Sequence, residues 1–151
     1  MHINIWDKEL ELLAKGSLEK ENVPIKNVYF HHFQAYEPWC RDHGPMFVVQ
    51  PNGNQAIVNW GYNAWGGKYP PFDLDNSIPS KVAEALGIPL IEPEMILEGG
   101  SIDVNGSQSL ITTEQCILNT NRNPNLNKQE IESMLSDFIG VKNITWLGYG
   151  I

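Results

Sequence analysis

The sequence is short of cysteine, of basic residues and of long hydrophobic runs. Two cysteines in 151 residues cannot build a disulfide framework, so a reduced, cytoplasmic setting is expected. Ten Lys and Arg against 18 Asp and Glu give a net charge of −8, which argues against a nucleic-acid partner. No apolar run approaches the roughly 18 residues that span a bilayer, and the N-terminus does not read as a signal peptide. We therefore expect no membrane association.

What the sequence does contain is enough apolar material for a packed core. Hydrophobic residues make up 42% of the chain, which is ordinary for a globular protein and argues against disorder. A length of 151 residues fits one domain or part of a larger one. The acidic balance is also suited to a cationic ligand.

Two turn signals recur at one spacing. Asn-Gly at residues 52–53 recurs at 105–106, and glycine followed by a β-branched residue at 87–88 recurs at 140–141, each time 53 residues later. Asn-Gly between apolar runs predicts a β-hairpin. The glycines at positions 87 and 140 are typical of a helix end. The order hairpin, helix, strand is therefore predicted twice, in units that must pack together to bury their apolar faces.

The predicted organisation is a single domain over residues 1–151, made of two repeat units and a preceding segment. The units cover about 39–91 and 98–147, and a strand–helix–strand segment over 2–31 precedes them, with Asp7 as its helix cap. The first unit is expected to contain a long loop rich in glycine and proline over residues 61–79 and a helix over about 80–86. The helix of the second unit is expected over about 128–139, where five apolar residues share one face.

Two acidic turns stand directly before the two predicted hairpins. Residues 39–45 read Trp-Cys-Arg-Asp-His-Gly-Pro, and residues 98–103 read Glu-Gly-Gly-Ser-Ile-Asp. If the two units are equivalent, Asp42 and Glu98 lie at the same end of neighbouring units, and their side chains are expected to converge. A carboxylate can hold a guanidinium through two hydrogen bonds, and Trp39 offers an aromatic face on which a cation can stack. The two turns therefore predict a site for a flat cation.

Less specific roles remain open for both acids. Asp42 can pair with Arg41 or cap nearby amides as a turn aspartate, and Glu98 can be a solvated side chain at a strand bend. The pair of glycines at residues 99–100 favours the functional interpretation, because it permits a close approach of backbone or ligand. A glutamate at the mouth of a buried strand is also suited to a raised pKa and to general-base catalysis.

Three competing sites are less well supported. Residues 66–68 read Gly-Gly-Lys, but a phosphate-binding loop needs glycine where Tyr62 stands and Ser or Thr where Tyr69 stands. The cysteines and histidines lack zinc-ligand spacing, so no metal is expected. Cys40 and Cys116 are candidate nucleophiles, but a free cysteine is more often a small buried apolar residue.

Four motifs together resemble those of the agmatine deiminase family, which groups with the bacterial-type peptidylarginine deiminases. They lie at residues 39–45, 63–69, 98–103 and 121–124, and the resemblance runs from about residue 28 to residue 151. It implies an α/β pentein fold, a pseudo-fivefold β/α propeller of hairpin–helix–strand units around a central site. The chain would hold about two to three of these units.

The resemblance also implies a reaction. A member of the family hydrolyses agmatine to N-carbamoylputrescine and ammonia, on the route to putrescine, through a covalent amidino-cysteine intermediate and without a cofactor. By motif match, Asp42 binds the guanidinium nitrogens, Glu98 helps to hold the guanidinium and orients the catalytic histidine, and Trp39 belongs to the substrate pocket. The expected partner is therefore a small cationic guanidine.

The chain departs from the family pattern in one respect. The Gly-His-x-Asp motif and the C-terminal Asn-x-His-Cys motif, which carry the general-acid/base histidine and the nucleophilic cysteine, are absent. We therefore expect a piece of a longer enzyme that is inactive alone. Peptidylarginine or arginine deimination, a non-catalytic guanidinium-binding module and a structural fragment remain as alternatives. The oligomeric state is open, a homo-oligomer included.

Overall fold

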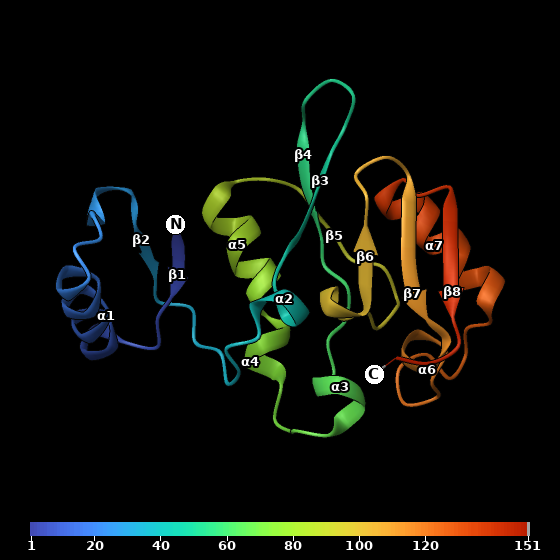
Figure 1. Ribbon diagram of the computed structural model, residues 1–151, viewed down its shortest axis with the longest axis horizontal. Coiled ribbons are helices and arrows are strands. Elements are labelled where there is room, and N and C mark those ends of the chain that lie inside the picture. The colour runs from blue at the N-terminus through green and yellow to red at the C-terminus, as the bar shows by residue number, and fades with distance from the viewer. Residues whose placement is uncertain (151) are drawn as a thin grey trace. The chain divides into compact units, whose positions relative to one another are not determined.

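The protein divides into two compact units (Figure 1). The structure is a computed structural model that describes residues 1–150. The first unit is Met1–Pro38, and the second begins at Trp39. Among the described residues, no helix has both the length and the apolar character needed to cross a bilayer.

The first unit is a strand, a helix and a second strand. Strand β1 (His2–Asn4) pairs in parallel with β2 (Tyr29–His31), and α1 (Lys8–Lys20) and the 3-10 turn η1 (Ile25–Asn27) connect them. The predicted cap is confirmed, because the Asp7 side chain accepts a hydrogen bond from the Leu10 amide at 2.9 Å. No residue of α1 is buried.

The second unit begins with a three-stranded sheet. Strands β3 (Met46–Val49) and β4 (Gln55–Val58) form an antiparallel hairpin, and β5 (Leu90–Ile91) joins β4 in parallel after helix α5 (Ile78–Leu86). Residues 61–79, expected as one loop, also contain the short helices α3 (Ala64–Gly67) and α4 (Asp73–Asn76). Helix α5 begins two residues before its predicted start, with a proline in its first turn, where the missing N–H costs nothing.

A second sheet repeats the same order. Strands β6 (Ile102–Val104) and β7 (Ser109–Thr113) form the hairpin, and β8 (Asn143–Leu147) joins β7 in parallel. The short α6 (Glu114–Ile117) and helix α7 (Lys128–Ile139) connect β7 with β8. Helix α7 has its predicted bounds. Asn127 and Glu130 cap its start reciprocally through side-chain hydrogen bonds of 3.1 and 2.8 Å.

The glycines that revealed the repeat occupy backbone conformations that other residues rarely adopt. Gly53 and Gly106 in the hairpin turns have φ of 87° and 68°, and Gly87 and Gly140 after the helices have φ of 65° and 73°. A side chain at such a φ brings Cβ too close to the carbonyl oxygen. The 53-residue period is therefore a period of left-handed backbone positions, which explains why it is visible in the sequence.

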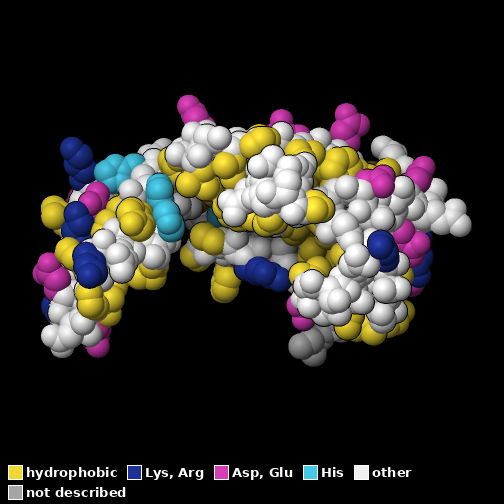
Figure 2. All heavy atoms as spheres, turned by 90° about the horizontal axis from the view of Figure 1, so that it is seen from above, with side chains coloured by type: hydrophobic (Ala, Val, Ile, Leu, Met, Phe, Trp, Pro, Cys, Tyr) yellow, Lys and Arg dark blue, Asp and Glu magenta, His cyan; other side chains and the backbone are white. Residues whose placement is uncertain are grey.

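The hydrophobic core joins the two sheets with helix α7. Its buried residues include Val58 from β4, Ile102 from β6 and Leu135 from α7, together with Trp60 and Leu97, which lie outside the strands. On β3 the side chains alternate, because successive residues of a strand face opposite sides. Phe47 and Val49 are accordingly exposed, and hydrophobic side chains are visible on the surface of the second unit in Figure 2.

We expect Gly140→Ala to lower the free energy of unfolding by about 1–2 kcal/mol, because a left-handed backbone conformation is less favourable for alanine than for glycine. The measurement is guanidinium chloride unfolding followed by circular dichroism. Gly140→Asn is the control, since asparagine tolerates this conformation better, and it should cost clearly less. Equal losses in the two variants would contradict a conformational role for Gly140.

Candidate functional site

The first acidic turn is a single helical turn, α2 (Cys40–His43), between Trp39 and Gly44. The Asp42 amide donates to the Trp39 carbonyl at 2.8 Å, and the Gly44 amide donates to the Cys40 carbonyl at 2.9 Å. A Cβ atom on Gly44 would overlap that carbonyl. The glycine is therefore required for space, and it ends the turn directly before β3.

The second acidic turn, the 3-10 turn η2 (Gly99–Ser101), follows Glu98 and packs against α2. A Cβ atom on Gly99 would overlap the Arg41 carbonyl, and a Cβ atom on Gly100 would overlap Oδ1 of Asp42. Neither glycine has a positive φ, so the reason for glycine is the close approach of the two turns. The structure thus brings the two acidic turns together.

The Asp42 carboxylate is held by two donors that are distant in sequence. Oδ1 accepts a hydrogen bond from the Gly100 amide at 3.0 Å, and Oδ2 accepts one from Nε1 of Trp65 at 3.2 Å. Arg41 does not pair with Asp42 but donates to the Ile102 carbonyl at 3.3 Å. The alternative of an aspartate paired with Arg41 is therefore wrong. Asp42 does cap an amide, but that amide belongs to the other acidic turn. Asp42 remains partly exposed.

Trp65 reaches Asp42 from a backbone that is strained. Ala64 and Trp65 have φ of 52° and 57° without being glycine, and each such residue costs of order 1–3 kcal/mol. The Asn63 side chain stabilises the turn by accepting from the Gly66 amide at 2.9 Å. The Trp65 ring packs edge-on against Tyr62 at a centroid distance of 5.6 Å. Strain of this kind persists where surrounding contacts fix the conformation.

Glu98 is buried and paired with Arg122. Its side chain is 3% exposed and that of Arg122 is 9% exposed. Both Nε and Nη2 of Arg122 contact the same oxygen, Oε1, at 2.9 and 2.8 Å. The interpretation of Glu98 as a solvated strand-bend residue is therefore wrong. A buried carboxylate needs such a partner, since an unpaired charge in this position is strongly destabilising.

The other oxygen of Glu98 has a weaker partner. The Cys116 thiol donates to Oε2 at 3.8 Å. The pKa of Cys116 is raised, mainly by burial of the thiol and further by the negative charge of Glu98. A thiol with a raised pKa is a poor nucleophile near neutral pH. Cys116, which the sequence left as a candidate nucleophile, is therefore better described as a neighbour of Glu98.

Trp39, the third sequence-predicted site residue, is exposed. It directly precedes α2 and has 57% of its surface accessible. No ring contact involving Trp39 occurs among the described aromatic pairs of residues 1–150. Its indole is therefore available to solvent beside the turn that carries Asp42.

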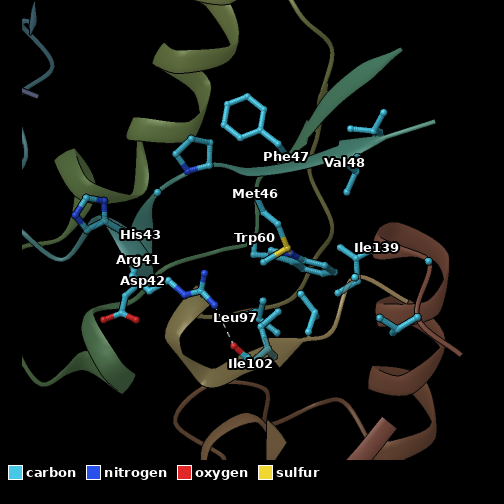
Figure 3. Close-up of a pocket in the computed structure, with 18 of the residues that line it drawn as sticks. Arg41, Asp42, His43, Met46, Phe47, Val48, Trp60, Leu97, Ile102 and Ile139 are labelled. Carbon is cyan, nitrogen blue, oxygen red and sulfur yellow. Dashed lines mark hydrogen bonds between the residues drawn. The ribbon is translucent and has the colours of Figure 1, made fainter. Parts of the chain in front are cut away.

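A cavity of about 910 Å³ lies beside α2, but its wall is mainly apolar. Met46, Trp60, Leu97 and Ile102 line it, and Arg41 reaches across it toward the Ile102 carbonyl (Figure 3). In the same view the Asp42 carboxyl group points away from the apolar side chains. Asp42 thus belongs to the wall of this cavity, but its carboxyl group is turned away from the apolar side. The carboxylates rather than the apolar cavity therefore mark the candidate site.

Two residues of this site had no assigned role in the sequence analysis. Trp65 and Arg122 lie in two of the four recognised motifs, at residues 63–69 and 121–124. The spacing of these motifs does not show that Trp65 touches Asp42 or that Arg122 touches Glu98. A useful signal was the single arginine in an otherwise uncharged segment, since a buried carboxylate requires a cation. Within residues 1–150 no group of three or more His, Cys, Asp or Glu side chains is arranged to hold a metal.

A family model described as Porphyromonas-type peptidyl-arginine deiminase matches residues 3–151. The chain therefore belongs to this family.

Among curated relatives, the agmatine deiminase of Pseudomonas syringae pv. tomato is 42% identical over 143 residues. The match covers 91% of this chain and 38% of the relative. Another agmatine deiminase, from Pseudomonas fluorescens, is 40% identical over 148 residues, which are 92% of this chain and 40% of the relative. The chain thus spans about two fifths of the length of the relatives it matches.

Solved structures agree with the family. An agmatine deiminase of Enterococcus faecalis superposes with a TM-score of 0.86 at 32% identity, over 99% of this chain and 40% of that one. A C. jejuni agmatine deiminase with substrate bound superposes with a TM-score of 0.78 at 32% identity, over 98% of this chain and 50% of that one. The predicted α/β pentein fold is confirmed.

We expect Gly99→Ala to loosen the contact between α2 and η2, because its Cβ would overlap the backbone carbonyl of Arg41, which cannot rotate away as a side chain can. Overpacking of this kind typically costs about 1–3 kcal/mol. The measurement is the free energy of unfolding in urea. Gly148→Ala is a matched control, since an added Cβ there meets no atom within 4 Å, and its stability should remain near that of the wild type. A stable Gly99→Ala protein would contradict the tight packing.

The raised pKa of Cys116 predicts a pH-dependent reactivity. In the native state the thiol keeps its proton to higher pH than an ordinary cysteine, whose pKa is about 8.5. Folding stability should accordingly fall as the pH rises above that value, because the unfolded thiol loses its proton first. Iodoacetamide alkylation of Cys116, read by mass spectrometry from pH 7 to 11, should show a higher midpoint in native protein than in urea. An equal or lower native midpoint would contradict this assignment.

Proposed function

We propose that the protein containing this chain hydrolyses agmatine to N-carbamoylputrescine and ammonia. The observation that carries the proposal is the packing of α2 against η2, which places the Asp42 carboxylate against the turn that follows Glu98. The printed names of the relatives support the choice of reaction, since they are agmatine deiminases. The chain supplies part of the substrate site, because it spans about two fifths of those proteins.

In this proposal Asp42 contacts the guanidinium directly. Its carboxylate is partly exposed and both of its oxygens are oriented by donors, Gly100 and Trp65. A carboxylate that is held in place before the substrate arrives binds and aligns the planar cation without reorganising. Charge-assisted hydrogen bonds to the guanidinium nitrogens fix the orientation of the carbon that is attacked.

Glu98 is proposed to act through Oε2, the carboxylate oxygen that Arg122 does not contact. Arg122 occupies Oε1 with two nitrogens, whereas within residues 1–150 the hydrogen bond of Oε2 is the weaker one from the Cys116 thiol, at 3.8 Å. Oε2 can therefore accept a stronger hydrogen bond from the substrate or from a catalytic histidine. Because Arg122 already compensates the charge of Glu98, this buried carboxylate orients its partners rather than supplying a free negative charge.

Trp39 is proposed to form one wall of the substrate pocket. Its indole is exposed directly beside α2, and an indole face attracts a cation with about 0.5–2 kcal/mol, depending on desolvation. The three residues thus combine two carboxylates with an aromatic face, which is suited to a group that is both flat and positively charged.

The covalent chemistry requires groups beyond this chain. A thiolate attacks the guanidinium carbon and forms a C–S bond, and the C–N bond to one terminal nitrogen breaks as that nitrogen takes a proton and leaves as ammonia. Water then adds to the amidino carbon, the C–S bond breaks, and the ureido product and the thiol are released. Cys116 is unsuited to this step because of its raised pKa. The nucleophile and the general acid/base histidine are therefore proposed to belong to the remaining length of the protein.

We propose a cytoplasmic setting, with which the two free thiols are compatible.

We expect Asp42→Asn in the full-length protein to lower kcat/KM for agmatine by tenfold or more, because the desolvated cation loses a charged partner. Ammonia release measures the rate. Agmatine, free arginine and a peptidyl-arginine, which share the guanidinium, are assayed side by side to establish which tail is accepted.

The matched control is Asp103→Asn, which removes the same charge from an exposed position on β6. Its kinetics should remain within about twofold of the wild type, since exposed charges contribute little. Near-native kinetics in Asp42→Asn would refute the role of Asp42. Wild-type protein that turns over arginine but not agmatine would refute the substrate.

A further inference from the structure

We infer that Arg122 and Trp65 are positioning residues that hold both site carboxylates through one connected brace. This inference rests on the proposed function, because it assigns a purpose to contacts of the same site. The brace consists of Asn63, Trp65, Gly66, Asn121 and Arg122. None of these side chains needs to touch the substrate, since each acts through Asp42, through Glu98 or through another member of the brace.

The first end of the brace fixes Glu98. Nε and Nη2 of Arg122 both contact Oε1, at 2.9 and 2.8 Å, and both side chains are nearly inaccessible to solvent. A planar guanidinium that uses two donors restrains both the position and the rotation of its partner. Since both donors are on one oxygen, the arrangement turns Oε2 away from Arg122 and leaves it to other partners.

The second end of the brace fixes Asp42. Nε1 of Trp65 donates to Oδ2 at 3.2 Å. The indole itself is restrained by edge-on packing against Tyr62 and Tyr69, at centroid distances of 5.6 and 5.7 Å. A rigid aromatic donor therefore sets the direction in which the carboxylate points.

The two ends are joined by contacts between residues 63–66, at the start of α3, and residues 121–122. Nδ2 of Asn63 donates to the Asn121 carbonyl at 2.9 Å, and Nη1 of Arg122 donates to Oδ1 of Asn121 at 2.9 Å. Gly66 lies so close that an added Cβ would overlap the side chains of Asn121 and Arg122. The Trp65 turn thus rests directly on the arginine that holds Glu98.

This junction accounts for the strained backbone. The positive φ angles of Ala64 and Trp65 place the indole within hydrogen-bond distance of Asp42. They also place Gly66 close to the side chain of Arg122. Strain is tolerated where surrounding contacts over-determine a conformation, and here they come from residues 121–122. A displacement of Arg122 is therefore expected to move Trp65 and, through it, Asp42. The two carboxylates are coupled although they lie in different repeat units.

The kinetic test uses Arg122→Lys and Trp65→Phe in the full-length protein. Lysine keeps the charge but loses the planar fork, and phenylalanine keeps the ring but loses the N–H. Because misplaced catalytic groups can cost up to about a hundredfold in rate, each variant should lose about tenfold or more, mainly in kcat rather than KM. The double variant should lose far less than the product of the single losses, since residues that act as a unit are non-additive.

Each variant has a matched control elsewhere in the second unit. Trp146→Phe removes another indole–carboxylate hydrogen bond, from Nε1 of Trp146 to Oε1 of Glu132 at 2.7 Å. Lys128→Gln removes an exposed ion pair, from Nζ of Lys128 to Oε1 of Glu114 at 2.8 Å. Both controls should keep kcat within about twofold of the wild type. Losses in Arg122→Lys and Trp65→Phe no larger than those of the controls, or multiplicative losses in the double variant, would overturn the inference.

A spectroscopic test is independent of turnover. The indole N–H signal of Trp65 in a ¹H–¹⁵N spectrum is identified by its loss in Trp65→Phe. The brace predicts that Arg122→Lys shifts this signal as Asp42→Asn does, whereas Lys128→Gln leaves it in place. An unshifted Trp65 signal in Arg122→Lys would overturn the coupling even in an active enzyme. Wild-type protein without agmatine turnover would instead refute the proposed function, and the spectrum would still decide the brace.

Discussion

The close approach of the turns α2 and η2 is the constraint on which the site depends. It is possible only because residues 99 and 100 lack side chains: a Cβ at either would overlap Arg41 or Asp42. The contact places a backbone amide of one repeat unit on a carboxylate of the other. It therefore brings two local turns, each with one acidic residue, together into one candidate site. The core that contains Val58, Leu97 and Leu135 packs together the two sheets that follow these turns in the chain.

The two acids are alike in sequence but different in environment. Asp42 is partly exposed and takes its hydrogen bonds from an amide and an indole, which are neutral donors. Glu98 is buried and takes its bonds from a guanidinium. The neutral donors leave the negative charge of Asp42 uncompensated, whereas the resident arginine compensates that of Glu98. The proposed binding of a cation by Asp42 rests on this difference. This asymmetry supports a division of labour in which one carboxylate binds charge and the other orients its partners.

The sequence predicted the parts of the fold that depend on local backbone chemistry. The glycines at positions 53, 87, 106 and 140 have positive φ in the structure, and such positions are recognisable because few other residues tolerate them. The cap at Asp7 and the bounds of α7 followed from equally local rules. The short helices α3 and α4 were not predicted, because each is only four residues long, and periodicity cannot identify a single turn.

The sequence by itself determined the repeated unit, the pentein class and the two acidic turns, since each of these follows from a local residue pattern or a motif match. Only the tertiary structure decided which donors reach the two acids. Trp65 lies 23 residues from Asp42, Gly100 lies 58 residues from it, and Arg122 lies 24 residues from Glu98. Hydrogen bonds over such separations are made by packing of the loops against one another, so neither composition nor spacing specifies them. The pairing of Glu98 with Arg122, and the orientation of Asp42 by a strained tryptophan, therefore belong to the folded chain alone.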